Sequence, residues 1–263
     1  MSLEQSQELS AAREKELIDI ADTLLDARRN GTSIDQIDPA IAPQSLQEAY
    51  FVQDIMAEAF GEIGGWKISS VGSEGVPFFA PMPLIWIAPS GSTIRGHHRL
   101  HGLEAEIAYQ IGTDLPPRTT PYTREEVVAA IAAAHPAFEI LEAALTSPTE
   151  SPRFSTFADM QMHGGFVYGP ATANWQSIDW SQESVTISVD GAVQVERTGS
   201  NPAGNDLLRL VLYLANEGSA RTGGLRRGQW ITTGSWVGNI WSRAGAVGDI
   251  HFAHAGHANL RFA

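Results

Sequence analysis

The stretch Gly102-Leu103-Glu104-Ala105-Glu106-Ile107-Ala108-Tyr109-Gln110-Ile111-Gly112 decides the fold. Every second residue from Leu103 to Ile111 is apolar, and Glu104 and Glu106 stand between apolar neighbours. Successive side chains of a strand point to opposite faces, so this spacing predicts a strand with one apolar face and one face that carries both carboxylates. The apolar face needs a core, and we therefore expect this strand in the interior of a sheet.

The two carboxylates of this strand have two interpretations. Neighbouring negative charges repel each other unless a positive charge lies close, and a hard divalent cation takes oxygen ligands of this kind. Alternating strands with outward Glu side chains are also common where one face of a sheet is in water. The pattern is therefore consistent with a metal site and with a solvated strand face.

Composition places the chain among ordinary globular proteins. It has 263 residues, 43% hydrophobic and 18% charged, which fits one large domain or one domain with an appendage. The 17 Lys and Arg against 30 Asp and Glu give a formal net charge of −13, which argues against a nucleic-acid partner. We see no signal peptide, no membrane-spanning run and no cysteine, so we expect a cytoplasmic protein without thiolate chemistry.

Helices and strands are expected to alternate without a regular βαβ period, which indicates an α+β class. Two amphipathic helices, at 10–29 and from Ser45 to Gly61, form an N-terminal helical appendage over residues 1–63, and residues 64–263 form a second domain. In that domain we expect a helix over 127–134, a loop over 146–165, a β-hairpin around Asp190-Gly191, a helix over 205–217 and strands after residue 229.

Two further charged residues lie in apolar surroundings. Lys67 stands between Trp66 and Ile68, where burial would suit proton transfer or anion binding, although a long Lys side chain also reaches solvent easily. Glu139 interrupts an apolar stretch, and a buried carboxylate needs a partner. Together with Glu104 and Glu106 it offers three oxygen ligands for Mg²⁺ or Mn²⁺, unless it faces solvent.

Two more positions have a possible chemical role. His163 precedes Gly164-Gly165 and is a candidate acid–base group. Thr233-Gly234-Ser235 ends a strand and could offer backbone N–H groups and hydroxyls to a carboxylate, or serve only as a turn. The histidines at 97, 98 and 101 lie in a polar segment, for which we favour a solvated loop over a zinc site.

Taken together, these motifs resemble the 2-keto-4-pentenoate hydratase and 4-oxalocrotonate decarboxylase branch of the fumarylacetoacetate hydrolase superfamily, from about residue 10 to the last strand. The resemblance rests on Gly65-Trp66-Lys67-Ile68, Glu104-Ala105-Glu106, Glu139, Ala158-Asp159, Gly164 to Gly169 and Thr233-Gly234-Ser235-Trp236. It implies a mixed β-sheet roll with an N-terminal helical part and a divalent metal on Glu104, Glu106 and Glu139. It also implies that Lys67 acts as an acid–base or substrate-carboxylate group.

The sequence departs from that branch at several pocket positions. Phe78 stands about where the branch has an Asp, and Met160-Gln161-Met162-His163 replaces an Asn-x-Ser-Ser stretch. We interpret this as a pocket for a larger or more apolar substrate, with Phe79 and Met162 as further lining unless these are ordinary core residues. The candidate catalytic residues are Lys67, His163 and Asp159, and the candidate substrate-binding residues are Phe78, Met160, Gln161, Thr233 and Ser235.

The resemblance implies a metal-dependent hydratase that adds water to a 2-hydroxydienoate or 2-oxo-enoate from aromatic catabolism. One such metal site also serves decarboxylation and C–C bond hydrolysis of related 2-oxo acids, so these activities stay open. A third alternative is a non-catalytic partner subunit. We expect a small-molecule 2-oxo acid as ligand and a homo-oligomer, with a decarboxylase or aldolase of the same pathway as a further partner.

Overall fold

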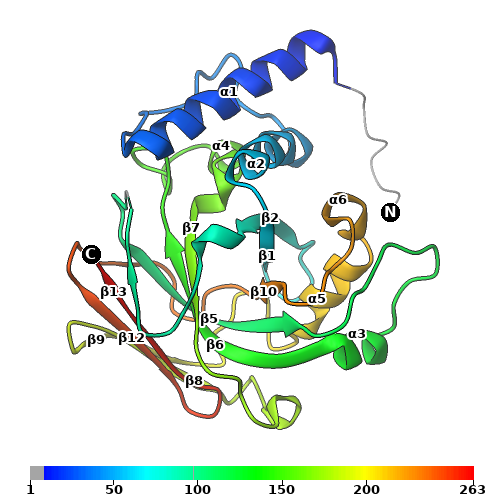
Figure 1. Ribbon diagram of the computed structural model, residues 1–263, viewed down its shortest axis with the longest axis vertical. Coiled ribbons are helices and arrows are strands. Elements are labelled where there is room, and N and C mark those ends of the chain that lie inside the picture. The colour runs from blue at the N-terminus through cyan, green and yellow to red at the C-terminus, as the bar shows by residue number, and fades with distance from the viewer. Residues whose placement is uncertain (1–8, 97) are drawn as a thin grey trace.

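The computed structural model describes residues 9–96 and 98–263, and Figure 1 shows their arrangement. The longer helices are α1 (Ala11–Asn30), α2 (Leu46–Phe60), α3 (Arg124–Ala130), α4 (Arg153–Ala158) and α5 (Leu208–Ala215). The short helical turns are α6 (Ser219–Thr222), η1 (Leu84–Trp86), η2 (Met160–Met162) and η3 (Trp175–Ser177). None of the described helices is long and apolar enough to cross a bilayer.

The strands form two sheets. The first contains β1 (Ile63–Ser69), β2 (Phe78–Pro83), β3 (Ile87–Pro89), β5 (Gly102–Ile111), β6 (Ile131–Leu141), β7 (His163–Tyr168), β10 (Trp230–Thr232) and β11 (Ile240–Trp241). Its order is β2-β1-β10-β5-β6-β7-β3, with β11 also paired to β5. The second contains β4 (Ser92–Ile94), β8 (Ser184–Val189), β9 (Ala192–Thr198), β12 (Val247–Phe252) and β13 (Gly256–Phe262), in the order β4-β13-β12-β8-β9. The expected α+β class with mixed sheets is confirmed.

Strand β5 lies in the interior of the first sheet, between β10 and β6, as its sequence predicts. Its alternate apolar residues from Leu103 to Ile111 are at most 1% exposed and join the main core. Residues of the second sheet, among them Ile187, Ile250 and Leu260, belong to the same core. The opposite face of β5 carries Glu104 and Glu106, so the core fixes the direction in which both carboxylates point.

The N-terminal helices begin and end where their capping residues indicate. The Ser10 side chain accepts a hydrogen bond from Arg13 N at the start of α1, and Gly31 ends this helix at φ 64°. Ser45 caps α2 in the same way through Glu48 N. Figure 1 shows both helices at one end of the molecule, next to α4. Their apolar residues share one cluster with Ala144, Leu145, Ala158 and Met160 of the following part of the chain.

Three secondary-structure expectations need correction. The helix expected over 127–134 ends at Ala130, because residues 131–141 pair along β5, and this pairing overrides the helix propensity of the alanines. The helix expected over 205–217 is the shorter α5. The segment 146–165 contains α4 and η2 and is not a plain loop. The hairpin around Asp190-Gly191 is confirmed, with positive φ at both turn residues as a type I′ turn requires.

We predict that Leu24→Ala in α1 destabilises the whole described chain. Leu24 is fully buried in the cluster that joins α1 and α2 to residues 144–160, and such truncations cost about 2–5 kcal/mol. All tryptophans lie after residue 63, and Trp86 packs against Phe60 of α2, so in a Trp86→Phe background tryptophan fluorescence during urea unfolding reports on residues 64–263. A shared core requires this transition to move to lower urea. An unchanged fluorescence midpoint, with loss of helical signal at lower urea, would show an independent appendage.

Candidate active site

Strand register brings the three glutamates of the sequence analysis together. Glu104 and Glu106 are two residues apart on β5, and Glu139 on β6 pairs directly with Glu104. Side chains directly opposite each other on antiparallel strands point to the same face, so all three carboxylates share one side of the sheet. One oxygen of each lies within 4.8 Å of the others. The three residues therefore form a compact cluster of oxygen ligands.

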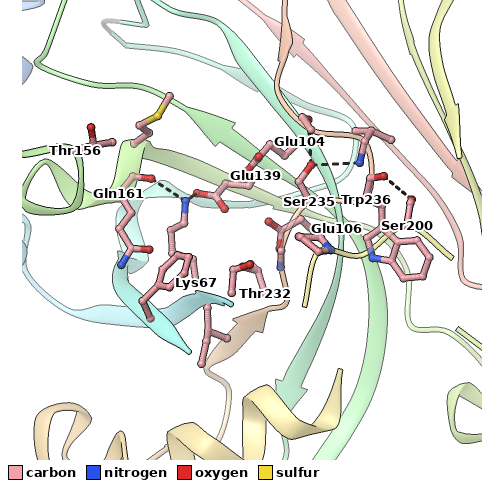
Figure 2. Close-up of a pocket in the computed structure, with 18 of the residues that line it drawn as sticks. Lys67, Glu104, Glu106, Glu139, Thr156, Gln161, Ser200, Thr232, Ser235 and Trp236 are labelled. Atoms are coloured by element: carbon pink, nitrogen blue, oxygen red, sulfur yellow. Dashed lines mark hydrogen bonds and ion pairs between the residues drawn. The ribbon is translucent and has the colours of Figure 1, made fainter. Parts of the chain in front are cut away.

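Lys67 reaches this cluster from β1, which lies two strands away. Lys67 pairs with Thr232 on β10, and Thr232 pairs with Ala108 on β5, two residues beyond Glu106. Figure 2 shows the Lys67 side chain directed toward Glu139. Its Nζ atom forms an ion pair with Glu139 Oε1 and donates a hydrogen bond to the backbone oxygen of Gln161 at 2.9 Å. The ammonium group therefore lies between a carboxylate and a carbonyl.

These groups line a cavity of about 550 Å³, part of which is drawn in Figure 2. Its polar lining consists of Lys67, Ser69, Glu104, Glu106, Glu139, Thr156, Gln161, Arg197, Ser200, Thr232 and Ser235. Its apolar lining includes Ile68, Phe78, Phe157, Met162, Pro202, Trp236 and Val237. The cavity lining thus combines charged and apolar side chains, as expected for a site that binds a small organic acid.

Backbone N–H groups hold Glu106 in place. Thr233 N and Gly234 N both donate to Glu106 Oε2, at 2.9 and 3.0 Å. Gly234 adopts φ 93°, which a residue with a side chain rarely takes, so the glycine allows this close turn. From its sequence, Thr233-Gly234-Ser235 is expected to offer N–H groups to a carboxylate or to serve only as a turn. Here that carboxylate is the protein's own Glu106.

Charge in the cluster is poorly balanced. Burial, together with the neighbouring Glu139, raises the pKa of Glu104 to about 8. Burial, together with the neighbouring charges of Glu139 and Glu104, raises the pKa of Glu106 well above its usual range. The pKa of Glu139 is lowered although burial opposes this, because Lys67 and His163 lie beside it. One ammonium group is therefore shared among three carboxylates, and the cluster lacks positive charge.

The donor set of the cluster fits a divalent cation. Glu139 Oε2 is buried and has no hydrogen-bond partner among the described residues. Three carboxylates that repel each other are suited to Mg²⁺ or Mn²⁺, which take oxygen ligands and leave positions open for a substrate. The unpartnered buried Oε2 atom of Glu139 supports cation binding, because a buried carboxylate oxygen normally has a partner.

His163 supports Glu139 from outside the cavity lining. Its Nδ1 atom lies 3.1 Å from Glu139 Oε1, and the ring is fully buried. Burial lowers the pKa of His163 although the carboxylate opposes this. A neutral ring can bind the carboxylate only through an Nδ1–H donor. The contact orients Glu139, which adds a positioning role to the acid–base role considered from the sequence.

A left-handed turn leads into the site just before His163. Met160, Gln161 and Met162 have φ values of 54°, 50° and 63°. Such conformations cost roughly 1–3 kcal/mol each for residues with a side chain, and they persist only when surrounding structure holds them. The turn gives the Gln161 carbonyl to Lys67 and places the Gln161 side chain in the cavity lining. Gln161 Nε2 is buried without a partner among the described residues.

Asp159, expected as a catalytic residue, lies outside the cavity lining and is fully buried. Its Oδ1 atom accepts a hydrogen bond from Arg28 Nε at 2.6 Å, and its Oδ2 atom accepts from Ala144 N and Leu145 N. Asp159 is therefore placed as a structural group next to the turn, without a direct path to a ligand in the cavity.

The other candidate residues are divided between cavity and core. Phe78, Gln161 and Ser235 line the cavity, as does Met162. Met160 is buried in the cluster with α1 and α2, because successive residues of a tight turn point in different directions. Phe79 belongs to the main core. Thr233 contributes its backbone N–H to Glu106 and its hydroxyl to Ile107 O, so it does not line the cavity.

Several cavity residues lie outside the sequence motifs. Thr232 comes directly before Thr233-Gly234-Ser235 at the end of β10 and lines the cavity, whereas Thr233 does not. Arg197 lies on β9 and Ser200 just after it, more than 90 positions from Glu104, and no local pattern marks them. Of the polar histidine segment, His97 lies outside the described residues, and the described His98 and His101 do not line the cavity.

In comparisons with known proteins, this chain matches solved structures but no family model and no curated sequence. The structure of 4-oxalocrotonate decarboxylase from Pseudomonas putida G7, complexed with magnesium and adipate, matches with a TM-score of 0.81 at 21% identity. That match covers 98% of this chain and 100% of the other.

More distant solved structures share the larger part of the fold. One is 2-hydroxyhepta-2,4-diene-1,7-dioate isomerase from Mycobacterium marinum, with a TM-score of 0.56 and 18% identity, covering 76% of this chain and 75% of that one. Another is fumarylpyruvate hydrolase from Pseudomonas aeruginosa in complex with Mn²⁺ and pyruvate, with a TM-score of 0.54 and 14% identity, covering 75% of this chain and 88% of that one. The resemblance inferred from the motifs is confirmed at the level of the fold: this chain has the fumarylacetoacetate hydrolase-like fold, with N-terminal helices before it.

Proposed function

We propose that this protein is a divalent-metal-dependent lyase of the fumarylacetoacetate hydrolase superfamily that acts on a 2-oxo acid. One observation carries the proposal: Glu104, Glu106 and Glu139 place oxygens within 4.8 Å of one another, beside Lys67 and in the lining of a cavity. Solved structures with this fold hold magnesium or Mn²⁺ together with adipate or pyruvate, which supports the same ligand chemistry here.

The three glutamates would hold Mg²⁺ or Mn²⁺. A bound divalent cation would supply Lewis-acid stabilisation of the negative charge that develops on the 2-oxo oxygen of the substrate. The protein provides the surroundings that this chemistry needs. Thr233 N and Gly234 N fix Glu106, and His163 fixes Glu139, so the ligand set is oriented before a substrate enters.

Lys67 is the proton donor in this proposal. Its ammonium group is held by the Gln161 carbonyl and Glu139 and faces the cavity that a substrate would fill. In a decarboxylation, the C–C bond to the departing carboxylate breaks, and its electron pair moves through the conjugated system toward the 2-oxo oxygen. CO₂ leaves, and Lys67 delivers one proton to carbon as the 2-oxo group re-forms.

The cavity favours decarboxylation over the hydration that the motifs suggested. Among the described lining residues, the titratable groups are the three glutamates, Lys67 and Arg197. If the glutamates hold a cation, Lys67 is the one group left to transfer a proton, which meets the need of a decarboxylation. Hydration also requires a base that activates water. The match over the full chain to 4-oxalocrotonate decarboxylase supports the same preference.

The reaction itself is tested by incubation with Mg²⁺ and a 2-oxo-enedioate, with the products followed by NMR. Decarboxylation gives CO₂ and a 2-oxo monoacid. Hydration gives a 4-hydroxy-2-oxo acid, and C–C hydrolysis of a suitable dioxo acid gives two fragments. No turnover of any of these substrates in the presence of Mg²⁺ or Mn²⁺ would contradict the proposed function.

Glu106→Gln is expected to abolish metal binding and activity while leaving the chain folded. The amide keeps the shape of the side chain but loses the charge that a cation needs, so Mg²⁺ affinity should fall at least about 100-fold. Isothermal titration measures this without turnover. Glu142→Gln is the matched control, since Glu142 is also a buried carboxylate that accepts backbone N–H groups, from Leu100 and Ala143. Equal Mg²⁺ binding by both variants would exclude the glutamate cluster as the metal site.

Lys67→Met should separate proton transfer from metal binding. Loss of the donor is expected to lower kcat by about 100-fold or more, the usual contribution of a positioned acid. Mg²⁺ binding should persist, because the three glutamates remain and Glu139 loses its competing ion pair. Lys15→Met, which changes an exposed lysine on α1, is the control and should keep full activity. A Lys67→Met enzyme with normal kcat would rule out Lys67 as proton donor.

Arg197 is expected to bind the second carboxylate of a dicarboxylic substrate. It lines the cavity, and within the described residues no acidic side chain forms an ion pair with it. Arg197→Met should raise KM for a 2-oxo diacid about tenfold and leave the inhibition constant of a 2-oxo monoacid such as pyruvate unchanged. Steady-state kinetics with the diacid, with and without the monoacid as competitive inhibitor, test this, and equal effects on both constants would contradict it.

A further inference from the structure

Arg28, near the end of α1, reaches into the body of the protein next to the active site. Its side chain is 5% exposed and pairs with the fully buried Asp159. Besides the Asp159 carboxylate, its guanidinium donates to three backbone oxygens: those of Asp159 at 3.0 Å, His163 at 2.8 Å and Glu142 at 2.9 Å. Arg28 therefore bridges the residue just before the left-handed turn 160–162 and the residue just after it.

The two ends of the turn are held firmly by this arrangement. The carboxylate of Asp159 also accepts from Ala144 N at 2.6 Å and Leu145 N at 3.2 Å, which ties the turn to the segment that follows β6. The backbone oxygen of Asp159 accepts from Met162 N at 3.0 Å. Three successive side-chain-bearing residues in the left-handed region do not persist without such restraint.

The turn in its left-handed form supplies two features of the cavity. The Gln161 carbonyl accepts the hydrogen bond of Lys67 Nζ at 2.9 Å. The Gln161 side chain lines the cavity, where its buried Nε2 atom has no partner among the described residues and can donate to an acceptor oxygen of a ligand. A relaxed turn would move both groups, although neither Arg28 nor Asp159 touches the cavity.

We propose that Arg28 and Asp159 are positioning residues of the active site: their buried ion pair holds residues 160–162 in the left-handed turn that aims Lys67 and the Gln161 amide at the substrate. This inference rests on the proposed function for its kinetic consequence. Its structural consequence can be measured without turnover. It also gives the N-terminal helix a part in the site, because α1 supplies one half of the pair.

The test compares Arg28→Lys with Arg13→Lys. A lysine keeps the positive charge but cannot donate in several directions from a planar group, so Arg28→Lys cannot span the Asp159, His163 and Glu142 oxygens together. Arg13 is the matched control on the same helix. It binds the Glu48 carboxylate and the backbone oxygens of Ile41 and Ala42, and it fixes α1 without touching the turn.

Three experiments are carried out on both variants: the crystal structure is determined, Mg²⁺ affinity is measured by isothermal titration, and kcat and KM are measured by steady-state kinetics. Arg28→Lys is expected to lose the left-handed φ values at 160–162 and the contact between Lys67 Nζ and Gln161 O. Its kcat should fall at least about tenfold, with a smaller change in KM, because misplacement by about 1 Å is costly in catalysis. Mg²⁺ affinity should stay within about threefold, since Glu104 and Glu106 lie on β5. Arg13→Lys should keep kcat within about twofold.

The outcomes are separable. An Arg28→Lys structure that retains the turn and the Lys67 contact overturns the inference, as does a kcat equal to that of Arg13→Lys. If Arg28→Lys does not fold, Asp159→Asn removes the charge, retains the side-chain shape and is subjected to the same measurements. If the wild-type protein binds no Mg²⁺ and turns over no 2-oxo acid, the proposed function fails, while the crystal structures still decide whether the ion pair holds the turn.

Discussion

Electrostatic repulsion among three carboxylates is the constraint on which the site depends. Glu104, Glu106 and Glu139 are forced to one face of the sheet because the apolar partners on β5 and β6 occupy the other face in the core. Lys67 and two backbone N–H groups compensate only part of this negative charge. The remaining negative charge favours the binding of a cation. The free energy of core packing offsets the repulsion among the three carboxylates and holds them together.

The groups that surround the three carboxylates come from distant parts of the chain. β1 brings Lys67, β10 and the turn after it bring the amides that hold Glu106, and β7 brings His163 against Glu139. The left-handed turn before β7 completes the set through the Gln161 carbonyl. Sheet strands carry the charged groups, and a restrained turn carries the Gln161 carbonyl, which is an arrangement that favours a pre-organised site.

The N-terminal helices contact the segment that carries the left-handed turn. They share an apolar cluster with residues 144–160, and Arg28 extends from α1 to the ends of the turn. The apolar spacing in residues 10–60 predicted both N-terminal helices correctly, because this spacing is a local property of the sequence. The helix expected over 127–134 was wrong because pairing with β5, a non-local interaction, decides the conformation of residues 131–134.

The sequence by itself determined that Glu104 and Glu106 share one face of a strand, since alternation along the strand fixes that face, and that the charges of Lys67 and Glu139 stand in apolar stretches and need partners. Only the tertiary structure decided that Asp159 pairs with Arg28, that Met160 enters the core, and that Arg197 and Ser200 reach the cavity. The reason is physical: local periodicity sets the direction of a side chain, whereas its neighbours depend on strand order and on how sheets and helices pack.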